Sequence, residues 1–395
     1  MNRLRQILPF AVFPVVVVGA QLVMRVTGTE FCLTQLTMAV YYAIVVMGLC
    51  LLMGYAGQVS LGHGAFFAIG GYTSAVLTTH DLSGVKATAW ATWLERAHLL
   101  VAKPDLYGNA AMTVSPWAAF LAAMFVTVLI ALLIGYPALR LRGHYLAMAT
   151  LGFGLIVSKL LVGSTITGSA DGINGVPDWK LVPGLTVTGK GAARVQNYYI
   201  ACGLALLLLL FLRNLVHSRV GRALQAIHDR ETAANAMGIN TAACKLKVFV
   251  LSALLASIAG VFFTHYTGGI GPSEAGALKS VRYVALAAAG GMANLWGVTI
   301  MSTALNYLSL RGWFGSYDNA VFGAILILII SVAPEGPLKP LGLWLRRLTG
   351  KRPASQASGS MDHVSRSTNP ALPATELAVQ AGEPNTGRRP GHGAA

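Results

Sequence analysis

Apolar runs make up most of the chain and are separated by short polar segments. They lie near residues 7–26, 34–53, 64–79, 115–138, 144–163, 197–212, 247–267, 282–294, 296–310 and 319–333. An α-helix needs about 20 residues to cross the hydrocarbon core of a bilayer. The pattern predicts an all-α fold, a polytopic transmembrane helix bundle of about 8–10 spans. Short or broken helices are expected near residues 64–79, 282–294 and 296–310.

The composition excludes a soluble enzyme domain. Of the 395 residues, 55% are hydrophobic and only 11% are charged, whereas soluble domains carry about 25% charged residues. The formal net charge is +15, but the basic residues cluster between apolar runs and in the tail. In those positions they set the topology and contact anionic membrane lipid, so nucleic acid is not expected as a partner.

The distribution of Lys and Arg predicts which side of the membrane each loop occupies. The segments 1–7, 139–144, 213–247 and 334–352 hold 2, 2, 6 and 5 of these residues, whereas the alternate segments 80–114, 164–196, 268–281 and 311–318 hold 3, 3, 1 and 1. Cytoplasmic loops carry the excess of basic residues, so both termini are expected in the cytoplasm. Val18-Gly19-Ala20 resembles a signal-peptide cleavage site, but the apolar run continues past it, which favours an uncleaved first span.

Two regions follow from this pattern. Residues 1–333 are expected to form a transmembrane domain with a long cytoplasmic loop at 213–247. Residues 334–395 begin with basic residues and become rich in Pro, Ser, Gly, Ala and Thr without apolar periodicity. Such a sequence buries too little apolar surface to fold, so it is predicted to be a basic and disordered cytoplasmic tail.

The chain lacks the patterns that are typical of catalytic, metal or cofactor sites. Its 14 acidic residues, Glu274 among them, fall in predicted loops, at span edges or in the tail. A proton- or sodium-driven carrier usually keeps an ionisable group inside the bundle, so such coupling is not expected. The 4 cysteines stand singly, without metal-ligand spacing. Gly184–Gly191 matches Gly-x4-Gly-Lys, but Gly191 replaces the Ser or Thr of a phosphate-binding loop, so neither ATP nor another cofactor is expected.

Two glycine-rich breaks interrupt the apolar pattern, at Gly54–Gly64 and at Gly290–Gly297. Unwound backbone at membrane depth is tolerated where it lines a cavity, so paired breaks indicate a translocation pathway. The polar residues expected near this pathway are Gln58, Ser60, His63 and Asn294. The alternative is that the glycines only allow close helix packing. Without an acid placed beside it, His63 is interpreted as a hydrogen-bonded structural histidine rather than a proton carrier.

The segment 218–240 within the long loop predicts a short helix outside the membrane. Asp229 is a candidate N-cap, Glu231 suits the positive end of the helix, and Gly238 offers a left-handed stop. Alanines would give this helix a low-relief surface with a charged rim, which another protein can seat in a groove. The docking residues expected from this pattern are Arg222, Asp229, Arg230, Glu231, Ala233, Ala234 and Gly238. An ordinary solvated connector is the alternative.

Several stretches together resemble one protein family. They are GYAGQVSLGHGAFFAIGGYT (54–73), LRLRGHYLAMATLGFG (139–154), GRALQAIHDRETAANAMGINTAACKLKVFVLS (221–252) and residues 290–297. In combination and order they are similar to the permease subunit of branched-chain amino-acid ABC importers. The resemblance covers roughly residues 30–335.

The resemblance implies a bacterial inner-membrane subunit that catalyses no reaction itself. It implies transport of a Leu-, Ile- or Val-like solute that a periplasmic binding protein delivers. The other implied partners are a second permease subunit and two cytoplasmic ATPase subunits, on one of which the helix from Asp229 to Gly238 docks. ATP hydrolysis belongs to those partners.

The sequence also departs from the family pattern. Leu155 stands where an acidic residue often follows Gly-Phe-Gly, His228 stands where arginine is common, and Asn235 where glutamate is common. Related permeases serve urea and other small amides, so an ABC permease for urea or short amides is the main alternative. A membrane enzyme or a non-transport membrane scaffold is the alternative from another class, although the bundle shows no recognisable constellation of nucleophile, base or metal.

Overall fold

The fold is taken from a computed structural model, which describes residues 2–80, 100–104, 110–139, 144–312 and 317–332. All of these residues belong to one compact unit. The predicted tail at 334–395 and most of the 80–114 loop lie outside the described residues.

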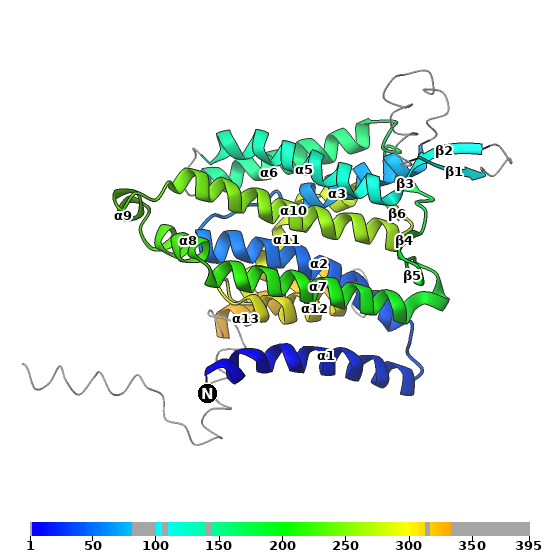
Figure 1. The fold of residues 1–395 in the computed structure, drawn as a ribbon, viewed down its shortest axis with the longest axis horizontal. Helices are drawn as coiled ribbons and strands as arrows, with labels where there is room; N and C mark the ends of the chain where they lie inside the picture. The colour runs from blue at the N-terminus through cyan, green and yellow to red at the C-terminus, as the bar shows by residue number, and fades with distance from the viewer. Residues whose placement is uncertain (1, 81–99, 105–109, 140–143, 313–316, 333–395) are drawn as a thin grey trace, which may run out of the picture. The chain divides into compact units, whose positions relative to one another are not determined.

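Helices dominate the described residues, which confirms the predicted all-α class (Figure 1). Those of the bundle are α1 (Asn2–Val26), α2 (Cys32–Cys50), α3 (His63–Thr79), α5 (Pro116–Ala138), α6 (His144–Gly163), α7 (Arg194–His217), α10 (Thr241–Thr267), α11 (Ala277–Ala289), α12 (Leu295–Leu310) and α13 (Asp318–Val332). Two short helices, α8 (Arg219–Asp229) and α9 (Glu231–Ala236), stand between α7 and α10. Single turns are η1 (Leu51–Tyr55), η3 (Gly191–Ala193) and η4 (Pro272–Ala275).

Helix lengths agree with a membrane bundle that contains short pieces. Within the described residues, five helical stretches are long and apolar enough to span a bilayer: Cys32–Tyr55, Pro116–Ala138, Tyr145–Gly163, Gly191–His217 and Thr241–Thr267. The helices α3, α11 and α12 have only 17, 13 and 16 residues. They coincide with the three runs that the sequence marks as short.

The core lies along α2 and α10. The helix α2 is buried along nearly its whole length and packs against α7, α10, α11 and α12. The helix α10 packs against α3 and α5, and a Cβ at Gly70 or Gly260 would overlap atoms of the facing helix. Because apolar burial gives little net attraction between helices in lipid, such close approach of backbones is a main source of helix association in the bundle.

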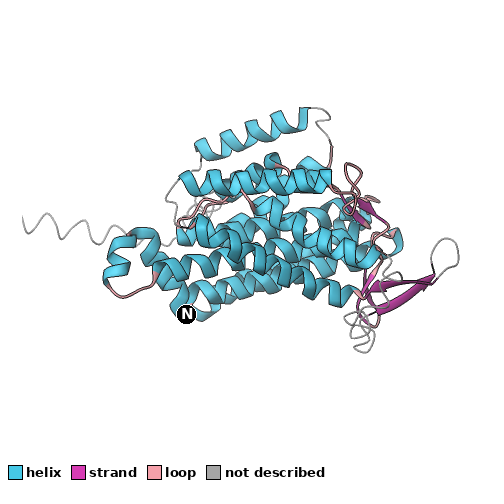
Figure 2. Ribbon diagram, turned by 90° about the horizontal axis from the view of Figure 1, so that it is seen from above, coloured by secondary structure: helices cyan, strands magenta, loops and turns pink. Residues whose placement is uncertain are grey.

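The two ends of this unit differ (Figures 1 and 2). Short antiparallel pairs, β1 (Leu100–Pro104) with β2 (Ala110–Val114), β3 (Ile173–Asn174) with β6 (Gly269–Ile270), and β4 (Trp179–Val182) with β5 (Leu185–Val187), gather at one end. The helices α8 and α9 lie at the opposite end, where α1 also begins. The predicted cytoplasmic loop and the start of α1 therefore share one side of the bundle.

Candidate functional site

The first glycine-rich break is the passage from α2 to α3. The last turn of the α2 span is the π-helical η1, and helical structure stops at Ala56 and resumes at His63. Gly57 adopts a φ of +66°, a region that glycine enters without the steric cost of a side chain. π-Helical turns of this kind are frequent at functional sites of proteins.

The second break separates α11 from α12. Gly291 adopts a φ of +89°, so the chain reverses sharply after Ala289. Asn294 then caps α12, since its side-chain oxygen accepts a hydrogen bond from the Gly297 backbone N–H at 3.2 Å. The Asn294 side chain therefore has a structural role in this conformation.

The two breaks contact each other directly. The Tyr55 hydroxyl donates a hydrogen bond to the Ala293 carbonyl at 2.7 Å, and the Cys50 thiol donates one to the Met292 carbonyl at 3.1 Å. At Gly54 the backbones approach so closely that an added Cβ would overlap the Met292 carbonyl. Segments that are far apart in the sequence thus pack backbone against backbone, and at Gly54 the glycine is needed for that packing.

The polar residues that the sequence places in the first break are all buried. Gln58, Ser60 and His63 expose 5%, 0% and 1% of their surface. His63 Nε2 shares a hydrogen bond of 2.6 Å with the Ser252 hydroxyl on α10, as expected for a structural histidine. The side-chain oxygen of Gln58 has no hydrogen-bond partner among the described residues.

The extramembrane segment forms two helices rather than the single one predicted. The first, α8, begins after Ser218, whose hydroxyl accepts a hydrogen bond from the Val220 N–H at 3.2 Å. Leu224 and Ile227 are buried one turn apart and hold α8 against the bundle, so the helix extends as far as Asp229.

The predicted N-cap at Asp229 is therefore wrong, since this residue ends α8. Arg230, with φ −152° and ψ 101°, occupies the N-cap of α9, and no side chain caps that helix. Gly238 does have the predicted left-handed conformation, with φ +82°. The Ile239 N–H there bonds to the Ala234 carbonyl at 3.1 Å, which satisfies one of the last carbonyls of the helix.

Most of the predicted docking residues lie at the surface of this segment: Arg222, Asp229, Arg230, Ala233 and Gly238 are exposed. Glu231 is half-buried and pairs with Lys245 on α10 at 2.7 Å. Ala234 is only 2% exposed, so its expected place on the low-relief surface is wrong. One side of α9 must face the bundle, and Ala234 lies on it. Sequence reasoning missed Met237, which is 81% exposed beside this surface.

The helix α8 also contacts the first break. An added Cβ at Gly57 would lie 2.8 Å from Nδ1 of His228, near the C-terminal end of α8. The imidazole thus covers the turn that begins the break. The sequence singles out both residues, but no local pattern indicates that they are neighbours.

A buried ionic cluster corrects the expectation that no acid lies inside the bundle. Glu274 is 7% exposed and forms an ion pair with Lys279. The Tyr42 hydroxyl lies 3.2 and 3.3 Å from the two carboxylate oxygens of Glu274. Tyr42 is near the middle of the Cys32–Tyr55 span, so Glu274 reaches a similar depth. The sequence around Glu274 suggests a loop because η4 is a single turn and the helix that follows it, α11, has only 13 residues.

The Gly-x4-Gly-Lys sequence has no phosphate-binding geometry. Three of the residues between its glycines, Leu185–Val187, form the strand β5, whereas a phosphate-binding loop needs irregular backbone there. Lys190 is paired with Asp178 at 2.6 Å.

Comparison with known proteins identifies the family. Residues 31–330 match the family described as the permease component of the branched-chain amino acid transport system. The chain belongs to this family. The high-affinity branched-chain amino acid transport system permease protein LivM of Salmonella typhimurium is 31% identical over 343 residues, which cover 81% of this chain and 73% of LivM. LivM of Escherichia coli is 30% identical over the same share of each chain.

Other relatives have lower sequence identity to this chain. LivH of Escherichia coli is 25% identical over 76% of this chain and 92% of LivH. No solved structure gives a significant match. The matched residues 31–330 include both breaks, the segment α8–α9 and the Glu274 cluster. The family and these relatives are described as permease components of transport systems.

Proposed function

We propose that this chain is the membrane-spanning subunit of an ABC importer that translocates branched-chain amino acids delivered by a periplasmic binding protein. Its relatives LivM and LivH are named as permeases of high-affinity branched-chain amino acid transport. The proposed complex holds a second permease subunit, two cytoplasmic ATPase subunits that hydrolyse ATP, and the binding protein. Its place is the bacterial inner membrane, in contact with membrane lipid.

The observation that carries the coupling mechanism is the contact between α8 and the first break. We propose that α8 and α9 dock on an ATPase through Arg222, Asp229, Arg230, Glu231, Ala233 and Gly238. Movement of α8 reaches the break at Gly57 through the His228 imidazole. From there it reaches the second break through the Tyr55–Ala293 hydrogen bond.

We propose that the breaks line the translocation pathway. Gln58 supports this role, because its buried carbonyl oxygen has no hydrogen-bond partner within the described part of the chain. Ser60, His63 and Asn294 lie on the same two breaks. A conduit benefits from such weak polar contacts, since tight binding would slow release of the solute.

The arrangement of the two ends of the bundle supports the proposed orientation in the membrane. The segment α8–α9 and the start of α1 share one end of the bundle, and both carry basic residues. This supports a cytoplasmic N-terminus. The proposed cytoplasmic C-terminus lies beyond the described residues.

Uptake by proteoliposomes tests the proposal. The purified complex would be reconstituted with both ATPases inside and loaded binding protein outside, and uptake of labelled leucine, isoleucine, valine and urea would be compared with and without ATP. We expect ATP-dependent uptake of the three amino acids only. ATP-dependent urea uptake in their place would support the amide-permease alternative, and leucine uptake driven by a proton or sodium gradient without ATP would refute the importer assignment.

A further inference from the structure

The segment 270–276 enters the bundle beside α3 without forming an α-helix. It begins at the strand β6, at the end that carries the short strand pairs, which is the outer end in the proposed orientation. An added Cβ at Gly71 of α3 would lie 2.5 Å from Cδ1 of Ile270, and one at Gly64 would lie 3.2 Å from the Glu274 carbonyl oxygen. Gly71 and Gly64 are separated by about two turns of α3, or about 10 Å. The segment therefore descends along α3 and reaches the start of this helix, where the first break ends.

The depth of this segment is incompatible with lipid around it. Glu274 is level with Tyr42, near the middle of the Cys32–Tyr55 span, so the segment lies in the outer half of a hydrocarbon core about 30 Å thick. Irregular backbone at such depth is tolerated only where protein buries it or where it lines a water-filled space. Glu274 is buried, but Ser273 beside it is exposed and Pro272 is only half-buried. The exposed part of the segment therefore fits a space that admits water.

The charged side chains beside the segment also indicate water at this depth. Lys279 forms an ion pair with Glu274, and the Lys279 side chain is 31% exposed. Ionisable groups within a membrane almost always face the bundle interior or a water-filled cavity. Lys279 also lines a cavity of about 70 Å³ between α2, α11 and α12, which has room for about two water molecules.

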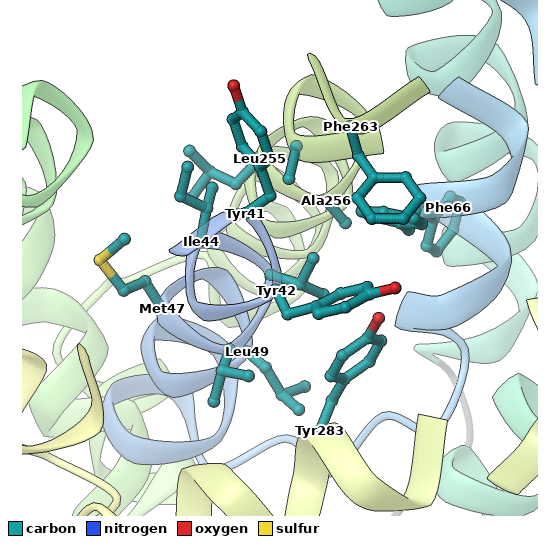
Figure 3. Packing of buried hydrophobic residues seen from close by; sticks show 14 of the residues in the cluster. Tyr41, Tyr42, Ile44, Met47, Leu49, Phe66, Leu255, Ala256, Phe263 and Tyr283 are labelled. Carbon is teal, nitrogen blue, oxygen red and sulfur yellow. The ribbon is translucent and has the colours of Figure 1, made fainter. Parts of the chain in front are cut away.

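Tyr283 of α11 lines the same cavity. Its side chain is 2% exposed, and its hydroxyl has no hydrogen-bond partner among the described residues. Figure 3 shows this hydroxyl close to that of Tyr42, which lies 3.2 Å from a carboxylate oxygen of Glu274, whereas Tyr41 points to the other side of α2. A buried hydroxyl without a partner is costly, so a water molecule in the cavity would stabilise it.

The segment also meets the first break. The Gly64 backbone N–H donates a hydrogen bond of 3.2 Å to the Ser280 hydroxyl, one turn into α11. His63, the residue before Gly64, stands where the first break ends and α3 begins. Its Nδ1 atom is buried and has no hydrogen-bond partner in the part of the chain that the structure describes. Polar groups thus continue from Ser273, past Glu274, to the first break.

We propose that residues 270–276 line the outer half of the translocation passage and lead the zwitterionic solute to the first break. The inference rests on the proposed function and adds an entry route to the two breaks. In this passage, Ser273 faces water on the outer side, and the Glu274–Lys279 pair lies where the passage reaches Gly64.

Thiol labelling from outside tests this passage. The complex carrying Ser273→Cys would be reconstituted in the same proteoliposomes, nucleotide-free or trapped with ATP and vanadate, and treated outside with a membrane-impermeant cationic methanethiosulfonate. Only the thiolate reacts, and thiolates form poorly in apolar surroundings. We expect Ser273→Cys to react at least about tenfold faster than Leu129→Cys in one or both states. Leu129 is the matched control, because it is 58% exposed near the middle of the apolar helix α5.

The unsubstituted protein gives the background of this labelling. Its cysteines Cys32, Cys50 and Cys202 are buried, and Cys244 lies near the start of α10, at the end of the bundle that carries α8 and α9. Labelling would be read on this subunit after separation from its partners by gel electrophoresis.

Transport distinguishes a passage from a surface that is merely wet. Ser273→Cys should import leucine at close to the wild-type rate before labelling, since the substitution is nearly isosteric. After labelling, uptake should fall at least about fivefold, because the added group narrows the passage, whereas wild type treated in the same way should be unaffected. Labelling no faster than that of Leu129→Cys in both states would mean that the second permease subunit covers Ser273.

That result, or normal uptake after complete labelling, overturns the passage and leaves the importer function standing. Failure of the untreated wild type to import leucine refutes the function itself.

Discussion

Substitution of Gly54 by alanine tests whether the two breaks work as one packed unit. A Cβ at this position would lie 1.5 Å from the Met292 carbonyl oxygen and 3.0 Å from the Ala293 nitrogen. Ordinary contacts of a Cβ begin at 3.4 Å. The two backbones must therefore separate by about 2 Å before the methyl group fits.

The cost of this separation can be worked out from the contacts that it breaks. Overpacking a tight interior costs about 1–3 kcal/mol even where flexible side chains yield, and here the opposing atoms belong to the backbone. Separation also stretches the Tyr55–Ala293 hydrogen bond of 2.7 Å and the Cys50–Met292 contact of 3.1 Å. A buried group that loses its partner costs about 1–3 kcal/mol. We expect Gly54→Ala to lower the free energy of unfolding by about 3 kcal/mol or more.

Unfolding of the purified complex in mixed micelles, followed by helical circular dichroism during titration with dodecyl sulfate, measures this effect. Gly203→Ala is the matched control, because Gly203 lies on α7 with nothing within 4 Å of its added Cβ. That variant should be neutral or slightly more stable, since alanine favours a helix over glycine by about 0.5–1 kcal/mol. Equal stability of the two variants would refute the close packing of the breaks.

Three further substitutions test the neighbouring contacts. Gly57→Ala introduces a side chain at positive φ and places its Cβ 2.8 Å from His228 Nδ1, so it should lower leucine uptake per ATP hydrolysed. Adding His228→Ala should restore part of this uptake. If the second substitution restores none of it, the contact between α8 and the first break is not what couples them. Gly238→Val, at φ +82° in open space, should weaken ATPase association measured by co-purification, whereas Gly238→Asn should keep most of it, because asparagine tolerates this conformation. Ser252→Ala removes the partner of His63 Nε2 and should destabilise the bundle by about 1–3 kcal/mol in the same micellar titration; unchanged stability would show that the hydrogen bond contributes little.

The sequence predicts the membrane class and the helix pattern because hydropathy alone sets both. A run of about 20 apolar residues favours a helix inside lipid, since a helix satisfies its backbone polar groups within its own segment. The short helices α3 and α12 are predicted because a glycine-rich stretch interrupts the apolar pattern before each of them. Helix boundaries at the extramembrane segment are predicted less well. There, the buried faces of α8 and α9 depend on tertiary contacts, which shift the cap from Asp229 to Arg230.

Glu274 shows why the interior of the bundle is harder to predict. The segment around it is short, contains proline and glycine, and carries an acid and a lysine, which is typical of an external loop. In the fold, η4 packs against α3 and α6, and Gly64 lies beside Ser280, so the segment reaches into the bundle. In the fold, Lys279 forms an ion pair with Glu274, five positions before it, and so compensates the charge that argues against burial. A hydropathy scale instead counts Lys279 as a second charged residue that disfavours burial.

Under the proposed coupling, the contacts at the breaks also predict an order of events in transport. Met292 and Ala293 of the second break contact Gly54 and Tyr55 of the first break. The turn at Gly57 lies next to His228 of α8. Displacement of α8 by an ATPase would therefore act first on the turn at Gly57 and only then on the second break. Because the backbones of the two breaks are in direct contact at Gly54, we expect the two breaks to move together. The Gly54→Ala complex, in which the breaks are separated, should still hydrolyse ATP in the presence of loaded binding protein but should transport less leucine per ATP. Gly238→Val should instead lower both the ATP hydrolysis rate and the leucine transport rate, because it affects the docking segment, which acts before the breaks.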